Sequence, residues 1–443
     1  MSKDDRSTMT QAARRRLRAI GRIAVLGTLA ALVATSCSDG HIDVRSVPAA
    51  GWSSYGGNSG NSNYSPAAPS ADLKLSWTRP TGGPVTSPTV MNGGGDVLVT
   101  ARTPNGCNFL VLDYRAGRKN FCKRMKDGFW GNAPVVDQFT QPYIGEPGKF
   151  LALTGGGPIR WRMDVPGVPT SAKFVSPGRI LITTSLGRVL IANSQNGDLA
   201  APARDLWSNV ATDPLTGFGD CVSGGPGCAI SAPPAVDWAG KRIFLNFFPQ
   251  GAKASQVKAL SYAQVDGKDT VTDAWVADLP GGVVGPPVSS NDGKTVYAFG
   301  RDGKIYALDA TNGTVRWSYD NGGYGFGTMS VSPDGLIIPA GTIGAPLVML
   351  HDDGDKATEV ARRDDLQTAG LATVTASGTA WAVIRQGTEL ELALAEIDTK
   401  TGKTKRTLPM PEAKGFATGV AVSPYGQLAV TTNIGKVYYY AAD

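Results

Sequence analysis

Apolar and polar positions alternate in short blocks over residues 296–320, and tight turns separate the blocks. Residues 296–299 and 305–308 are apolar runs of strand length, and residues 314–319 follow an Asn-Gly pair. Asp-Gly and Asn-Gly pairs favour two-residue hairpin turns, because glycine and asparagine tolerate the positive φ that such turns need. The block pattern therefore predicts three antiparallel strands. An isolated ribbon has nothing to pack against, so the pattern also predicts further copies.

Copies of this pattern recur along the chain. A small or apolar run, a turn and a β-rich run begin at Ser87, Ala133, Ser171, Ala232, Pro286, Thr328, Leu371 and Thr418. Closing strands lie between these openings, at Trp77, Phe121, Trp161, Trp207, Trp275 and Trp317 and in weaker form near Glu359 and Arg406. The spacing scatters around the ~40–50 residues of a four-stranded propeller blade. A solenoid fits less well, because it lacks a four-strand unit.

The sequence therefore predicts an all-β, eight-bladed β-propeller with four-stranded antiparallel blades over residues 73–443. The last unit has only three strands of its own. We expect residues 73–77 to supply its outer strand, which closes the ring and leaves no open edge. The 56 glycines exceed the ~7% of an average protein, as a turn-dense β structure requires.

The segment from Asp302 to Trp317, DGKIYALDATNGTVRW, resembles the pyrroloquinoline-quinone-type β-propeller repeat. Residues 52–66, WSSYGGNSGNSNYSP, resemble the segment that precedes the first blade in such proteins. Two families share this repeat. One comprises the quinoprotein dehydrogenases, which are eight-bladed enzymes, and the other comprises non-catalytic envelope lipoproteins, such as the scaffold subunit of the outer-membrane β-barrel assembly machinery.

The resemblance implies the fold and leaves the chemistry open. Quinoprotein enzymes hold their cofactor between a tryptophan floor and a disulfide of adjacent cysteines, beside a Ca²⁺ ion and an aspartate base. This chain has no adjacent cysteine pair, and the calcium ligands and the base do not map onto its residues. A repeat is not an activity. We therefore assign no catalytic, cofactor-binding or metal-binding residue.

The first 36 residues have the composition of an export signal. Arginines precede an apolar run over residues 23–34, which is short for a bilayer span and long enough for a signal-peptide core. Residues 34–37, Ala-Thr-Ser-Cys, resemble a lipobox, so cleavage would leave Cys37 as the lipidated first residue. Ordinary signal cleavage that leaves Cys37 as an unpaired thiol is the alternative. Arg14-Arg15 with Leu17 also permits a twin-arginine signal.

The charge of the chain follows this division. Residues 1–36 carry seven Lys or Arg and two Asp or Glu, so the remainder has a net charge of about +1. The basic character belongs to the targeting segment and gives no argument for a nucleic-acid partner. We expect a lipoprotein signal peptide over residues 1–36 and a tether with an N-terminal extension over residues 37–72.

Four further cysteines are an even number in a chain predicted to be exported. Cys107 and Cys122 flank a hairpin, and Cys221 and Cys228 enclose a glycine-rich loop. Three pairings are open in principle, and sequence-local pairing is favoured because it needs the least chain rearrangement. A thiolate metal site fits poorly, because neither spacing is CxxC and no histidine lies nearby.

Catalytic groups are scarce. The chain has two histidines, and His41 lies in the predicted tether. Residues 351–355, His-Asp-Asp-Gly-Asp, form an acidic cluster that could hold Ca²⁺, but they lack the ligand pattern of an EF-hand and fit a solvated hairpin turn better. The glycine-rich runs match no nucleotide-binding loop, and no helix follows them.

We therefore expect an exported, lipid-anchored propeller in the cell envelope, facing the extracytoplasmic side, that binds a protein partner. The rival is a quinone-dependent dehydrogenase with a divergent site. A third candidate is a sensor or substrate-binding lipoprotein with a small ligand at the central channel. The missing adjacent cysteines and calcium ligands favour the first over the second.

Overall fold

The computed structural model describes residues 44–443 apart from residues 105, 127–131, 267, 324, 326, 342–345, 388–390 and 443. The chain divides into two units, Met1–Val44 and Arg45–Asp443, and the second contains the sheets. The predicted signal peptide over residues 1–36, the predicted lipidation site Cys37 and residues 38–43 of the predicted tether lie outside the described residues. In the part that the structure describes, no helix is long and apolar enough to cross a bilayer.

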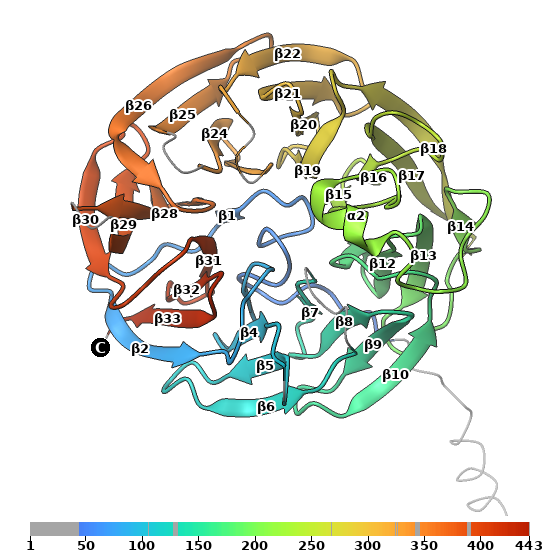
Figure 1. The fold of residues 1–443 in the computed structure, drawn as a ribbon, viewed down its shortest axis with the longest axis horizontal. Coiled ribbons are helices and arrows are strands. Elements are labelled where there is room, and N and C mark those ends of the chain that lie inside the picture. The colour runs from blue at the N-terminus through green and yellow to red at the C-terminus, as the bar shows by residue number, and fades with distance from the viewer. Residues whose placement is uncertain are drawn as a thin grey trace, which may run out of the picture. The chain divides into compact units, whose positions relative to one another are not determined.

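Within the second unit, antiparallel sheets follow one another around a ring (Figure 1). The first five sheets have four strands each. They consist of β3–β6 (Val90–Met91, Val97–Thr100, Phe109–Leu112, Lys119–Lys123), β7–β10 (Val135–Val136, Pro142–Glu146, Lys149–Leu153, Ile159–Asp164), β11–β14 (Lys173–Ser176, Arg179–Thr183, Arg188–Asn193, Arg204–Asp205), β15–β18 (Ala235–Asp237, Arg242–Phe247, Gln256–Val265, Lys268–Asp278) and β19–β22 (Val283–Ser289, Thr295–Gly300, Lys304–Asp309, Val315–Asp320).

A nine-stranded sheet and a closing sheet complete the ring. The nine-stranded sheet holds the runs β23–β26 (Met329–Val331, Leu336–Pro339, Pro346–Asp352, Ala357–Thr368) and β27–β30 (Thr373–Thr375, Thr379–Gln386, Glu391–Asp398, Thr404–Pro409), together with β1 (Tyr64–Ser65). The closing sheet holds β31–β33 (Ala417–Val422, Leu428–Thr432, Lys436–Ala441) and β2 (Lys74–Pro80). The predicted all-β propeller with four-stranded antiparallel blades is confirmed. The predicted count of eight treats the two runs of the nine-stranded sheet as separate blades.

The N-terminal strand closes the last sheet, as the three-stranded ending of the sequence predicts. Strand β2 pairs antiparallel with β33, with Lys74 opposite Ala441 and Pro80 opposite Lys436. Trp77 of β2 stacks on the ring of Tyr439, with 4.8 Å between the ring centroids. The first and last strands of the ring are therefore held together by hydrogen bonds and by aromatic stacking.

The hydrophobic core lies between neighbouring sheets. Successive residues of a strand point to opposite faces. In β11, Phe174 accordingly packs with residues of the sheet β7–β10, and Val175 packs with residues of the sheet β15–β18. Each sheet thus contributes side chains to two clusters, which makes the stability of one sheet depend on both neighbours.

The tryptophans of the closing strands connect each sheet to the next. Their indole N–H groups donate as follows: Trp77 to the Tyr114 carbonyl (3.0 Å), Trp161 to the Ser194 carbonyl (3.0 Å), Trp207 to the Phe248 carbonyl (2.8 Å), Trp275 to the Ala310 carbonyl (3.1 Å) and Trp317 to the Asp352 carboxylate (2.8 Å). Four of the five lie in strands, whereas Trp207 lies two residues beyond β14. Every acceptor belongs to the following sheet or to one of its turns, so each indole is a clamp between two sheets.

Glycines in the receiving turns make room for these rings. A Cβ atom on Gly313 would lie 2.5 Å from the Trp275 ring, and one on Gly117 would lie 2.6 Å from the Trp77 ring. Both glycines have positive φ, 77° and 64°. The Asn-Gly turn at residue 313 therefore serves two purposes, because it provides the left-handed conformation and leaves space for the indole of the preceding sheet.

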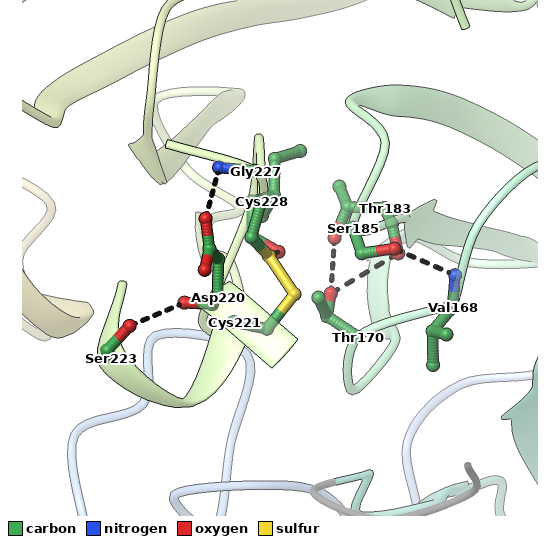
Figure 2. Close-up of a disulfide and its surroundings, with 10 residues drawn as sticks. Val168, Thr170, Thr183, Ser185, Asp220, Cys221, Ser223, Gly227 and Cys228 are labelled. Atoms are coloured by element: carbon green, nitrogen blue, oxygen red, sulfur yellow. Dashed lines mark hydrogen bonds between the residues drawn. A yellow bond between two sulfur atoms is a disulfide. The ribbon is translucent and has the colours of Figure 1, made fainter. Parts of the chain in front are cut away.

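In the described part of the chain, helix α2 (Phe218–Ser223) interrupts the all-β pattern, and no local sequence pattern predicts it. It lies between β14 and β15 in a loop that the Cys221–Cys228 disulfide closes (Figure 2). The second disulfide joins Cys107 to Cys122. Both are the sequence-local pairs favoured above.

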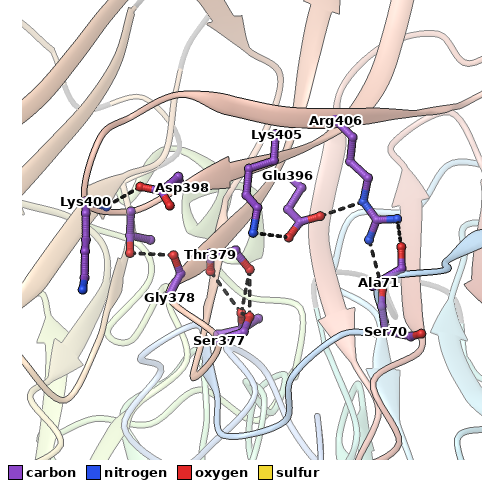
Figure 3. Close-up of polar contacts among 12 residues, drawn as sticks. Ser70, Ala71, Ser377, Gly378, Thr379, Glu396, Asp398, Lys400, Lys405 and Arg406 are labelled. Atoms are coloured by element: carbon purple, nitrogen blue, oxygen red, sulfur yellow. Dashed lines mark hydrogen bonds and ion pairs between the residues drawn. The ribbon is translucent and has the colours of Figure 1, made fainter.

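In the weaker seventh repeat an arginine takes the place of the tryptophan. Arg406 lies opposite Glu396, as Trp317 lies opposite Ala307 and Trp275 opposite Ala259. Its guanidinium donates to the carbonyls of Ser70 and Ala71, which directly precede β2, and pairs with Glu396 at 2.7 Å (Figure 3). An arginine can therefore make the same donor connection to the following sheet where the indole is absent.

The close contact between a turn glycine and the indole ring can be tested with a matched control. Gly313→Ala and Gly322→Ala both place alanine at positive φ, 77° and 69°, but a Cβ on Gly322 meets no atom within 4 Å. We expect Gly322→Ala to lower the free energy of unfolding by the ~1–2 kcal/mol of the left-handed conformation alone. Gly313→Ala should lower it by roughly a further 1–3 kcal/mol, since the Trp275 ring must move. Equal losses in denaturant unfolding would remove the steric role of Gly313.

Candidate functional site

The segment from residue 45 to residue 66 lies in the middle of the ring (Figure 1), and we call it the plug. Its backbone carbonyls accept hydrogen bonds from the innermost strand of one sheet after another: Ser53 from Val136, Ser59 from Val236, Gly60 from Ser289, Ser62 from Val331 and Asn63 from Val374, all at 2.7–3.1 Å. Strand β1 continues these contacts as a parallel partner of β27. The plug therefore lies across the centre of the ring at the C-terminal ends of the innermost strands.

Two asparagines of the motif over residues 52–66 fix the plug in the channel. The side-chain amide of Asn61 donates to the carbonyls of Pro234 and Pro287, each at 3.1 Å, and the amide of Asn63 donates to Met329 at 3.0 Å. Both asparagines have positive φ, 59° and 47°, a conformation that asparagine tolerates better than most residues. The asparagine-rich motif thus satisfies carbonyls of the innermost strands that the sheets leave unpaired.

Lys173 of β11 is fully buried against the plug. Its Nζ donates to Ser54 Oγ at 3.1 Å, to the Tyr55 carbonyl at 2.5 Å and to the Asn58 carbonyl at 2.6 Å. The ammonium also lies 5.8 Å from the centre of the Tyr55 ring. Three acceptors match the three donors of an ammonium group, so this lysine ties the plug to the wall of the ring.

Burial dominates the electrostatics of this contact. It lowers the pKa of Lys173 well below its usual value, and it raises the pKa of the Tyr55 hydroxyl. The three acceptors around Nζ oppose the effect on Lys173, because they stabilise the charged form. The contact therefore depends on accurate geometry, and loss of any acceptor would leave a buried charge less well compensated.

The sequence analysis missed Lys173. The available signal was a lysine in the opening run SAKFV, where most of the other openings carry only small or apolar residues. The predicted tether also differs from the structure at its end, since Ser46 and Ala49 are buried and the Ala49 N–H donates to the Val136 carbonyl at 2.8 Å. Residues 45–50 are thus part of the folded unit and not a free tether, because they bond to β7.

At the opposite end of the ring, a small pocket lies among the N-terminal ends of the innermost strands. It has a volume of about 160 Å³, and its walls include Thr86, Asn132, Thr170, Phe218, Cys221 and Pro233. These residues precede β3, β7, β11 and β15 or belong to the disulfide-closed loop with α2. We call this pocket the channel mouth.

The polar groups of the channel mouth are largely paired with each other (Figure 2). Ser185 Oγ accepts from the Val168 N–H at 2.9 Å, and the hydroxyls of Thr170 and Thr183 lie 2.5 Å apart. Asp220 accepts from the Gly227 N–H at 2.7 Å, which fixes the loop beside the disulfide. None of the described residues that line the pocket carries a charge.

The quinone cofactor of the dehydrogenase family does not fit the channel mouth. Among the described residues, the lining contains no lysine or arginine to compensate three carboxylates and no tryptophan floor, and Cys221 pairs with Cys228 instead of an adjacent cysteine. A pocket of about 160 Å³ is also smaller than the ~300–1,000 Å³ of typical cofactor sites. We derive no redox step from this site.

The acidic cluster at residues 351–355 forms local contacts. His351 Nδ1 lies 2.8 Å from the Asp353 carboxylate and Nε2 lies 2.9 Å from the Asp334 carbonyl, while Asp352 accepts from Trp317 and Tyr297. The Asp353 hydrogen bond is the main cause that raises the pKa of His351. Among the described residues, no group of three or more His, Cys, Asp or Glu is placed to hold a metal ion.

Comparisons with known proteins place this fold in context. The family model described as outer membrane protein assembly factor BamB matches residues 253–441. Protein Rv3035 of Mycobacterium tuberculosis is 30% identical over 412 residues, which cover 91% of this chain and 99% of that protein. The match runs over nearly the whole length of both proteins.

Solved structures resemble the chain in fold. Quinohemoprotein alcohol dehydrogenase from Comamonas testosteroni superimposes with a TM-score of 0.58 at 14% identity, over 90% of this chain and 81% of the enzyme. BamB from Moraxella catarrhalis superimposes with a TM-score of 0.52 at 15% identity, over 83% of this chain and 99% of BamB. Identities this low support the propeller fold and leave the function to the site.

The Lys173 contact can be tested by removing its charge and its donors together. Lys173→Met should lower the free energy of unfolding by about 1–3 kcal/mol, because the carbonyls of Tyr55 and Asn58 would stay buried without a partner. The plug should also become cleavable by protease within residues 45–66. Lys294→Met, whose side chain is 74% exposed, is the control and should change stability by less than about 0.5 kcal/mol. Unchanged stability and protection in Lys173→Met would contradict the role of this lysine.

Proposed function

The chain belongs to the family of Protein Rv3035, and we propose that it is an exported, lipid-anchored β-propeller that binds a protein partner in the cell envelope. The BamB-like family match and the propeller fold support a scaffold of this kind. The poor fit of the channel mouth to a quinone speaks against the dehydrogenase alternative.

One observation carries the proposal for a protein partner. The loop from Trp207 to Ile230 presents Val222 with 68% of its surface exposed and Leu215 with 43% exposed. The Cys221–Cys228 disulfide and the hydrogen bond from the Gly227 N–H to Asp220 restrict the part of this loop that carries Val222, and Leu215 precedes that part. A restricted loop loses little conformational entropy on binding, so exposed apolar groups on it are suited to a protein interface.

A small polar ligand at the channel mouth is a second candidate. Its support is the size of the pocket and its uncharged lining, in which hydroxyls and the amide of Asn132 lie among apolar side chains, as suits a molecule of a few heavy atoms. Val222 and Cys221 belong both to this lining and to the exposed loop, so a ligand and a protein partner would meet at one place.

Site-specific cross-linking tests the partner. A photoreactive residue replacing Val222 should give one discrete protein adduct in intact envelopes, while the same residue at Val265 should give none. Val265 is a matched control, because it is a valine with 60% exposure on the remote β17–β18 hairpin. Addition of Leu215→Ser to the Val222 probe should weaken the adduct. Identical adducts at both positions, or none at either, would contradict binding through this loop.

Membrane attachment has its own test. Cys37→Ala should move the protein from the membrane to the soluble fraction, because a thioether-linked diacylglycerol supplies two chains at about 0.8 kcal/mol per buried CH₂. The remainder of the chain is nearly neutral and offers little electrostatic attraction to a bilayer. Fractionation after a salt wash measures the effect, with Ser38→Ala as the control. A Cys37→Ala protein that still sediments with membranes would show that another contact holds it.

A further inference from the structure

The ring has two different faces, and the plug defines one of them. The plug bonds to the innermost strands near their C-terminal ends, where each innermost strand turns into the second strand of its sheet. These first turns therefore share one face, which we call the plug face. The turns between second and third strands, such as the one between β32 and β33, lie on the other face with the channel mouth.

Three first turns expose large aromatic side chains on the plug face. Phe139 in the β7–β8 turn is 48% exposed, Trp238 in the β15–β16 turn is 36% exposed and Tyr425 in the β31–β32 turn is 67% exposed. Turns of this kind usually carry small or polar residues at their tips. These three side chains lie on three different sheets, and together with the groove described next they form the apolar part of the plug face.

A groove lies between Trp238 and the plug. It has a volume of about 680 Å³ and is lined by Trp238 together with Val47, Pro48, Ala49, Tyr64 and Pro66. The carboxylates of the same turns point inward, since Asp137 and Asp237 are buried and accept from the Phe139 and Gly240 N–H groups at 2.9 Å. The tips beside the groove thus present the Trp238 ring and the exposed Lys241, while Asp237 lines the groove and the side chain of Asp292 in the next first turn is 52% exposed.

The chain enters the folded unit on this same face, between two of the aromatics. The Ser46 carbonyl accepts from the Gly178 N–H in the β11–β12 turn at 2.7 Å, and Gln138, next to Phe139, accepts from and donates to Val47. The sheet β11–β14 lies between the sheets that carry Phe139 and Trp238. The entry point therefore lies between the Phe139 turn and the Trp238 turn.

The distance from Cys37 to this entry point is limited by the chain itself. Eight Cα–Cα steps lead from Cys37 to Arg45, and they span at most about 29 Å when fully extended. A lipid on Cys37 therefore stays within about 29 Å of the entry point, which lies on the plug face.

We infer that the plug face lies on the membrane surface, with Phe139, Trp238 and Tyr425 in the lipid headgroup region. The inference rests on the proposed lipidation of Cys37. Aromatic rings favour this region, because one part of the ring system meets acyl chains while polar edges stay hydrated. The occupant of the groove is accordingly the bilayer, and the channel mouth points away from it.

An environment-sensitive fluorophore on single cysteines tests the orientation. Phe139→Cys and Ile434→Cys are a matched pair, since both native side chains are 48% exposed and they lie on opposite faces. In lipidated protein on phosphatidylcholine vesicles, the label at 139 should shift to shorter wavelength and lose emission to nitroxide-labelled lipids. The label at 434 should do neither. Trp238→Ser with Tyr425→Ser should reduce the response at 139.

A second attachment separates this inference from lipidation. The mature chain with a hexahistidine tag in place of Cys37 is held on vesicles that contain a nickel-chelating lipid, and the two labels are compared again. If the label at 139 alone is quenched in this protein and the native chain does not attach to membranes, the plug face prefers the bilayer but Cys37 does not carry a lipid anchor. Equal quenching at 139 and 434 in a protein that is lipidated would overturn the inference and leave the anchor in place.

Discussion

The structure depends on the contacts between each sheet and the next, and at most junctions these include a hydrogen bond donated by the closing strand. In five places this donor is an indole N–H, and in the seventh repeat it is the guanidinium of Arg406. A four-stranded sheet with apolar side chains on both faces is stable only between two neighbours, so the donors and the clusters between sheets act together. The contact of Arg406 with Ser70 and Ala71 matters most, because these residues lead directly into β2.

The plug adds a second system of contacts that crosses the ring instead of following it. Lys173, Asn61 and Asn63 connect one segment of about twenty residues to sheets that are far apart in the sequence. The result is a propeller with two different faces: one closed by backbone and amide hydrogen bonds, the other open at a small uncharged pocket. This asymmetry gives the chain two distinct surfaces, and our two proposals assign one of them to a membrane and the other to a partner.

Much of this could be predicted from the sequence, and the reasons for success and failure are physical. The repeats were visible because turn chemistry such as Asn312-Gly313 and the closing tryptophans are local signals. The plug, Lys173 and α2 were not, because their partners are distant in the chain and no local pattern encodes such contacts. The motif over residues 52–66 could be predicted only by its resemblance to known proteins. The structure adds its role, which is that the amides of Asn61 and Asn63 donate to carbonyls in or beside the innermost strands. The hydroxyls and amides at the channel mouth come from four different sheets and loops. No spacing along the sequence reveals that they lie together.

The pairing of β2 with β33 has a consequence for the order in which the molecule folds. Thr81 bonds to the Gly435 carbonyl across 354 residues, and Asn63 reaches Met329 across 266. Contacts this distant form late, because the entropy of closing such long loops opposes them until most of the intervening chain is ordered. The N-terminal segment is synthesised first and yet must wait for the last residues before it can dock. A chain of this family is therefore expected to complete its synthesis with its plug and its closing strand unpaired, and to depend during that interval on protection of those strand edges from other chains.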